Sequence, residues 1–186
     1  MRNLIKVLDI ILDENRKLLS GISEAHICDL VDKVNNASKI FCFAMGRSGY
    51  ILRCFSMRLM HLCYPVYFVG ETITPKVQAG DLLIVVSGSG ETGLTYHVTA
   101  LARNQGAVTY GIVGSHNSRI ASELDHCLCL PGGSKIAFPG DIPSCQPVGS
   151  LFEQAAFLFF EGVIIEICSR KRGMQEDVLG HHANLE

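Results

Sequence analysis

Apolar residues follow two different spacings along the chain, and the first of these is helical. Near the N-terminus they stand three and four residues apart, as they do on one face of an α-helix. These residues are Leu4, Val7, Leu8, Ile11 and Leu12. A second helix is expected to start at Ser23, because serine is a favoured residue at helix starts. The pattern over residues 1–38 therefore predicts a pair of helices.

From Lys39 onward the pattern changes to short, continuous apolar runs. They cover residues 40–44, 66–69, 82–86, 108–113 and 127–130. Runs without polar alternation are typical of strands buried on both faces, as in a parallel sheet covered by helices. Longer amphipathic segments at 48–62 and 91–104, and an apolar one from about 151 to 169, would supply the covering helices.

We therefore predict an α/β fold of three layers, in which a five-stranded parallel sheet of the flavodoxin-like order 2-1-3-4-5 lies between helices. The sequence contains no internal repeat, low-complexity tract or long linker. Residues 1–186 are accordingly expected to form one domain. Its parts are the N-terminal helices at 1–38, the sheet with its covering helices at 39–170, and a C-terminal tail at 171–186.

Composition narrows the class of partner. The 16 Lys and Arg residues nearly balance the 18 Asp and Glu residues, so the chain lacks the positive excess of a nucleic-acid binder. The 8 cysteines are scattered without a C-x-x-C pair, which favours reduced thiols and a cytoplasmic location. The most apolar stretch, 155–168, contains Glu161 and Glu166 and is shorter than the roughly 20 apolar residues of a membrane span. We expect neither nucleic acid nor membrane as a partner.

Two segments that directly follow apolar runs carry the candidate chemistry. Residues 44–49 (AMGRSG) follow the first run and residues 87–92 (SGSGET) follow the third. In the predicted strand order these runs are neighbours, so both segments would border the crevice where such sheets bind ligands. Glycine-rich backbone, hydroxyl groups and a helix N-terminus together favour a bound phosphate. The candidate phosphate and sugar ligands are Gly46, Ser48, Ser87, Gly88, Ser89, Gly90 and Thr92.

A simpler interpretation of the same serines remains open. Ser48 and Ser89 each precede a predicted helix, where serine is most often an N-cap. Two such segments at one crevice favour phosphate binding over capping. A dinucleotide is disfavoured, because no G-x-G-x-x-G motif follows the first run and no Walker A lysine is present.

The S-x-S-G-x-T pattern of residues 87–92 resembles the phosphosugar-binding loop of sugar isomerase (SIS) domains. Over about residues 41–186 the chain is similar to the 6-phospho-3-hexuloisomerase family, whose fold is a SIS-type parallel sheet between helices. The similar segments are GRSGY, SMRLMHL, FVGETITP, SGSGET, GSLFEQ and the terminal HHANLE. Ala44 and Met45 depart from the more glycine-rich entry to the first loop in that family.

The resemblance implies an enzyme that interconverts D-arabino-hex-3-ulose 6-phosphate and D-fructose 6-phosphate through an enediolate, in the ribulose monophosphate pathway of formaldehyde fixation. It also implies a homo-oligomer, in this family a homotetramer. Moving a carbonyl between adjacent carbons requires proton transfer but no redox cofactor. The 7 histidines show no metal-ligand spacing. We therefore expect a metal-independent intramolecular oxidoreductase without cofactors.

Glu153 is the candidate base. On the last long helix it shares a face with Phe160 and Ile164, and loss of solvent makes a carboxylate a stronger base. A structural role is equally open from the residues alone. Residues 150–153 (SLFE) spell a capping box, in which Glu153 would accept a hydrogen bond from the Ser150 amide. The resemblance favours the catalytic role.

Arg47 and His182 complete the candidate catalytic set. From its position Arg47 either stabilises the negative charge of an enediolate or forms a salt bridge at the rim, and neither role is preferred. His182 lies in a charged tail, where histidine is usually solvated. The resemblance implies that His182 enters an active site, its own or that of a neighbouring subunit, and moves protons on the substrate oxygens.

Two alternative functions remain. One is a non-catalytic SIS module that senses a sugar phosphate, although about 38 residues before the first strand leave little room for a DNA-binding domain. The other is an isomerase of the arabinose 5-phosphate type. Isomerases of that type have loops similar to those of this chain but typically carry lysine at the position of Arg47.

Overall fold

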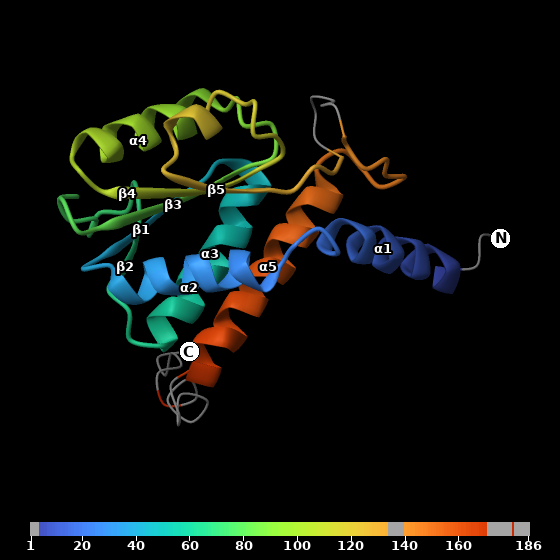
Figure 1. Cartoon of the computed structure of the whole chain (residues 1–186), viewed down its shortest axis with the longest axis horizontal. Helices are drawn as coiled ribbons and strands as arrows, with labels where there is room; N and C mark the ends of the chain where they lie inside the picture. Colours follow the sequence, from blue (N-terminus) through green and yellow to red (C-terminus); the bar gives the residue numbers. More distant parts are fainter. Residues whose placement is uncertain (1–3, 134–139, 171–179, 181–186) are drawn as a thin grey trace.

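The computed structural model describes residues 4–133, 140–170 and 180 (Figure 1). The helices are α1 (Leu4–Leu19), α2 (Glu24–Asn36), α3 (Gly46–His61), α4 (Gly93–Asn104) and α5 (Ser150–Arg170), with a short 3₁₀ turn, η1 (Ala121–Glu123), after the fourth strand. The strands are β1 (Ile40–Phe43), β2 (Val66–Phe68), β3 (Leu82–Ser87), β4 (Val108–Val113) and β5 (His126–Cys129). The predicted strands and the N-terminal helical pair are confirmed.

All five strands pair in parallel, in the order β2-β1-β3-β4-β5. The predicted three-layer α/β fold and its strand order are therefore confirmed. Helix α4 lies over one face of the sheet, and α2, α3 and α5 lie over the other (Figure 1). Strand β1 shows why the apolar runs lack polar alternation. Its residues Ile40 and Cys42 join the core on the α3 and α5 side, whereas Phe41 and Phe43 join the core under α4.

Helices α3 and α5 pack against each other on one side of the sheet. The rings of Phe55 and Phe160 stack with centroids 4.3 Å apart, and both side chains are fully buried. Because α3 carries Arg47 near its start and α5 carries Glu153 near its start, this contact helps to fix the distance between them. Although α5 is strongly apolar, no helix of the described residues has the length and hydropathy needed to cross a membrane.

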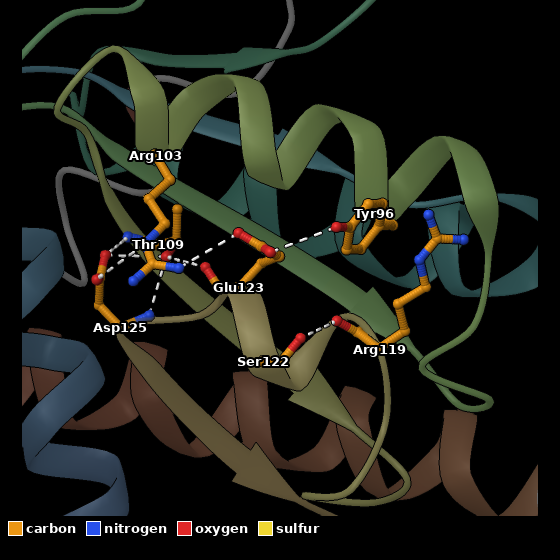
Figure 2. A network of polar contacts seen from close by, with 7 residues as sticks. All are labelled: Tyr96, Arg103, Thr109, Arg119, Ser122, Glu123 and Asp125. Atoms are coloured by element: carbon orange, nitrogen blue, oxygen red, sulfur yellow. Dashed lines mark hydrogen bonds and ion pairs between the residues drawn. The ribbon is translucent and has the colours of Figure 1, made fainter.

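Figure 2 shows the polar side chains that tie α4 to the segment before β5. Tyr96 and Arg103 of α4 donate hydrogen bonds to the two carboxylate oxygens of Glu123, at 3.4 and 3.3 Å. The backbone N–H and the hydroxyl of the buried Thr109 both donate to Asp125 Oδ2 at 2.9 Å. The Glu123 contacts hold the chain between β4 and β5 against α4, and the Asp125 contacts hold it against β4. The same stretch supports the glycine-rich loop after β3, because the Ile120 N–H donates to the Gly90 carbonyl.

The aromatic stack between α3 and α5 gives the first prediction. Phe160→Ala removes a fully buried ring and is expected to lower the free energy of unfolding by about 3–5 kcal/mol. Urea denaturation followed by circular dichroism measures the change. Ile73→Ala, which shortens an apolar side chain at a residue 77% exposed, is the control and should lose less than about 1 kcal/mol. Equal losses in the two variants would contradict the stated role of the stack.

Candidate functional site

The loops that follow β1 and β3 meet at the carboxyl edge of the sheet and enclose a cavity of about 350 Å³. Parallel pairing of β1 with β3 brings them together, because parallel neighbours end at the same edge. The start of α5 and the loop before it close the cavity. Its lining residues are Met45, Gly46, Arg47, Ser48, Val86, Ser87, Gly88, Ser89, Thr92, Val148, Gly149, Phe152 and Glu153.

The loop after β3 gathers three hydroxyl groups at the start of α4. Ser87 Oγ lies 3.2 Å from Thr92 Oγ1. Ser89 Oγ accepts a hydrogen bond from the Glu91 N–H at 3.2 Å. Thr92 occupies the N-cap position of α4, so the capping role considered for Ser89 is wrong. The Thr92 hydroxyl makes no capping bond to the helix, which leaves it directed to the cavity side of the loop.

Helix α3 starts earlier than the sequence pattern predicted, at Gly46 instead of Ser48. Met45 holds the N-cap position, which places Ser48 inside the first helical turn. The capping role considered for Ser48 is therefore also wrong. The first residues of α3 line the cavity, so the partial positive charge of a second helix N-terminus lies beside the hydroxyl groups of the β3 loop.

Gly90 is the one candidate ligand of the glycine-rich loop that does not line the cavity. It has a φ of +65°, its N–H donates to Ser87 Oγ at 3.1 Å, and its carbonyl accepts from the Ile120 N–H at 2.8 Å. A Cβ at this position would come within 2.1 Å of Ser118 Oγ. Gly90 therefore supports the conformation of the loop on the side away from the cavity, where it packs against the segment between β4 and β5.

Arg47 and Glu153 form an ion pair inside the cavity. Arg47 Nε donates to Glu153 Oε2 at 2.5 Å, although the two residues are 106 positions apart in the chain. The Glu153 side chain is 11% exposed and that of Arg47 is 72% exposed. A buried carboxylate is thus paired with a largely exposed guanidinium in the wall of the cavity.

The capping box considered for Glu153 is absent. The Ser150 N–H donates to the Pro147 carbonyl at 2.9 Å, so it does not need the Glu153 carboxylate. The carboxylate points instead to Arg47. The salt bridge considered for Arg47 is present, and its partner is the candidate base. The geometry therefore brings the two candidate catalytic residues of the described chain together.

Several lining residues could not be recognised from the sequence. Phe152 is an ordinary apolar helix residue in the pattern, yet its ring would lie 3.0 Å from a Cβ at Gly88. This close approach explains why glycine is needed there. Val148 and Gly149 belong to a loop without periodicity, and only their nearness to Glu153 in the sequence hinted at the site.

Three further points concern the tail, metal binding and a cysteine near the site. His182 lies outside the described residues, so its predicted role at the site stays a prediction. Within 4–133 and 140–170, no group of three or more His, Cys, Asp or Glu side chains is arranged to hold a metal ion. Burial raises the pKa of the Cys42 thiol on β1 to about 12, so the cysteine nearest the first loop stays protonated at neutral pH.

Comparison with known proteins identifies close relatives. A family model described as SIS domain matches residues 33–156. The chain is 36% identical to the 3-hexulose-6-phosphate isomerase of Bacillus subtilis, over 95% of each chain. It is 38% identical to the protein of that name from Methanocaldococcus jannaschii, over 84% of this chain and 82% of the other.

A solved structure agrees with these sequence matches. It is that of a hypothetical protein from Methanococcus jannaschii, for which a molecular function of 3-hexulose-6-phosphate isomerase was inferred. Its TM-score to this chain is 0.81 at 34% identity, and the match covers 97% of this chain and 99% of the other.

The contact behind Gly90 gives the second prediction. Gly90→Ala forces a left-handed residue and a clash with Ser118, and it should lower the free energy of unfolding by about 2–4 kcal/mol. Gly93→Ala is the control, because a Cβ there meets nothing within 4 Å, and its effect should stay within about 1 kcal/mol. Chemical denaturation of both variants makes the comparison. A Gly90→Ala chain as stable as Gly93→Ala would show that the loop is not held in this way.

Proposed function

Because the chain belongs to the SIS domain family, we propose that it is a sugar-phosphate isomerase that interconverts D-arabino-hex-3-ulose 6-phosphate and D-fructose 6-phosphate. The proposal rests on one observation above all. A buried carboxylate and a guanidinium meet in the same cavity as a hydroxyl-rich loop at a helix N-terminus. A phosphate anchor and an acid–base pair are what this reaction requires.

The phosphate of the substrate binds to the loop after β3. Ser87, Ser89 and Thr92 supply hydroxyl donors, Gly88 lets the backbone approach, and the start of α4 adds a favourable partial charge. Gly46 and Ser48, in the first turn of α3, contact the phosphate or the adjacent sugar carbons. The anchored phosphate then places the reacting carbons toward the start of α5.

Glu153 carries the proton between carbons. Starting from the 3-hexulose, its carboxylate takes the proton from C2, and the electron pair of that C–H bond forms the double bond of a 2,3-enediolate. The proton is returned to C3, while the C2 hydroxyl gives up its own proton, the oxygen on C3 gains one, and C2 becomes the new carbonyl carbon. Arg47 holds Oε2, so we assign the proton transfer to Oε1.

Arg47 stabilises the enediolate. Its guanidinium is largely exposed and paired through Nε alone, which leaves its remaining N–H groups for the developing oxygen charge.

The ring form of the sugar bears on the role of His182. The phosphate is on O6, so the 3-hexulose cannot form a five-membered ring through that oxygen and arrives open-chain. Fructose 6-phosphate is mostly a furanose. We assign to His182 the transfer of protons on oxygen, chiefly in opening and closing that ring.

Incubation with fructose 6-phosphate in deuterated water tests the function. The wild-type chain should incorporate solvent deuterium at C3 of fructose 6-phosphate and at C2 of the 3-hexulose, as followed by NMR. Glu153→Gln can still accept the Arg47 hydrogen bond but cannot accept a proton, so kcat should fall roughly 10²- to 10⁴-fold with similar substrate affinity.

Glu161→Gln is the matched control for this experiment. Glu161 lies on the same helix and pairs with Arg58 at 4.0 Å, away from the cavity, so its loss should leave kcat unchanged. Deuterium exchange that persists in Glu153→Gln would remove Glu153 from the mechanism. Tight binding of fructose 6-phosphate by the wild type without any exchange would support the sensor function instead.

We further propose that the protein is a cytoplasmic homo-oligomer, a homotetramer as in the family it resembles. Six cysteines, Cys28, Cys42, Cys54, Cys127, Cys129 and Cys168, carry free thiols, as is usual in a reducing compartment. Large apolar side chains remain exposed on the outer faces of three helices, which supports burial against other subunits. They are Val7, Leu8, Ile10 and Leu12 on α1, Tyr50, Met57 and Met60 on α3, and Phe157, Leu158 and Ile165 on α5.

Complementation tests whether subunits share a site. Glu153→Gln and His182→Ala chains are each expected to be nearly inactive alone. Co-expressed and purified as mixed oligomers, they should regain activity, because some sites would combine an intact Glu153 with an intact His182 of a neighbour. Light scattering confirms the oligomer. Mixed oligomers with no more activity than either variant would show that His182 does not serve a neighbouring subunit.

A further inference from the structure

Helix α1 holds the loop that leads into α5 through a single carboxylate. Glu14 Oε2 accepts hydrogen bonds from Ser144 Oγ at 2.6 Å and from Gln146 Nε2 at 2.8 Å. Glu14 Oε1 accepts from the Cys145 N–H at 2.9 Å. Three successive residues of an irregular segment therefore bind one side chain that lies about 130 positions earlier in the sequence.

These contacts belong to a closed ring of hydrogen bonds. From Glu14 the ring passes to Gln146, whose Oε1 accepts from Gln154 Nε2 at 2.9 Å. Gln154 Oε1 in turn accepts from Asn15 Nδ2 at 2.6 Å, and Asn15 follows Glu14 on α1. The ring starts and ends on α1 and includes both the loop and the first turns of α5.

The charge of Glu14 suits this role. Hydrogen bonds from Ser144, followed by that from the Cys145 amide, lower its pKa from 4.5 to about 2. The carboxylate is therefore ionised at neutral pH and accepts all three hydrogen bonds at once. Hydrogen bonds to a charged acceptor are stronger than neutral ones, so the contact resists opening of the loop.

The ring adjoins the cavity directly. Gln154 is the next residue after Glu153, and Gln146 lies two positions before Val148, which lines the cavity together with Gly149. The Glu153 N–H donates to the Gly149 carbonyl at 3.0 Å. Any displacement of the 144–149 segment therefore moves both the wall of the cavity and the first turn of the helix that carries the carboxylate.

We propose that Glu14 is a positioning residue for the active site, which holds the 144–149 segment and the first turn of α5 so that Glu153 faces the reacting carbons. The inference rests on the proposed function. Glu14 does not touch the cavity, and its effect on turnover passes through Gln146, Gln154 and the loop. The phosphate loop after β3 has no part in the ring, so the role concerns the chemical step and not substrate affinity.

Glu14→Ala tests whether Glu14 acts on the chemical step or on substrate affinity. We expect kcat with fructose 6-phosphate to fall at least tenfold, while the dissociation constant from calorimetry changes less than threefold, in protein shown to be folded by circular dichroism. Hydrogen–deuterium exchange at the amides of residues 144–149 should become faster. Glu14→Gln keeps the size and one acceptor oxygen, and it should recover part of the lost kcat.

Asp13→Ala is the matched control. Asp13 is the neighbouring acid on α1 and pairs with the exposed Arg16, so its loss should leave kcat and the exchange of residues 144–149 unchanged. Faster exchange in Glu14→Ala with unchanged kcat would reduce Glu14 to a structural residue and overturn the inference. Unchanged exchange would overturn it as well. A wild-type chain without isomerase activity would reject the proposed function itself, and the exchange arm alone would still decide whether Glu14 holds the loop.

Discussion

The parallel pairing of β1 with β3 is the constraint on which the site depends. It places the start of α3, which carries Arg47, and the loop with the clustered hydroxyl groups at the same edge of the sheet, so that both line one cavity. Neither segment could bind and activate a sugar phosphate alone. Helix α5 then adds the carboxylate from the side, and its packing against α3 fixes how near Glu153 comes to Arg47.

The electrostatics of the site are local. The chain as a whole carries a formal charge of −2, which would not attract a dianionic ligand. In the proposed function the attraction comes instead from hydroxyl groups, backbone N–H groups and two helix starts within a few residues of the cavity. The only full positive charge among the lining residues is that of Arg47, and it is already balanced by Glu153. In the proposed mechanism this pair stays intact when the substrate binds, so Arg47 holds Oε2 while its other N–H groups face the enediolate.

The sheet, its strand order and most helix bounds could be predicted, because continuous apolar runs report burial on both faces. The start of α2 at Ser23 was predicted correctly, but the starts of α3 and α4 were not. Ser48 and Ser89 matched the statistics of N-caps, but Met45 and Thr92 hold those positions, since the chain direction after each strand decides where a helix begins. Side-chain contacts between residues far apart in the chain could not be predicted from the apolar pattern either. Nothing in the sequence paired Glu153 with Arg47 instead of with the Ser150 amide.

The location of Glu153 on α5 affects how such an enzyme could change over evolution. That helix is also the most deeply buried one, with Phe152, Phe160 and Ile167 in the main core, so substitutions along it disturb folding before they alter chemistry. The loop at 140–149, part of which lines the cavity, carries little of that core. We therefore expect a change of sugar phosphate to arise through this loop, while the helix that bears the carboxylate stays nearly constant.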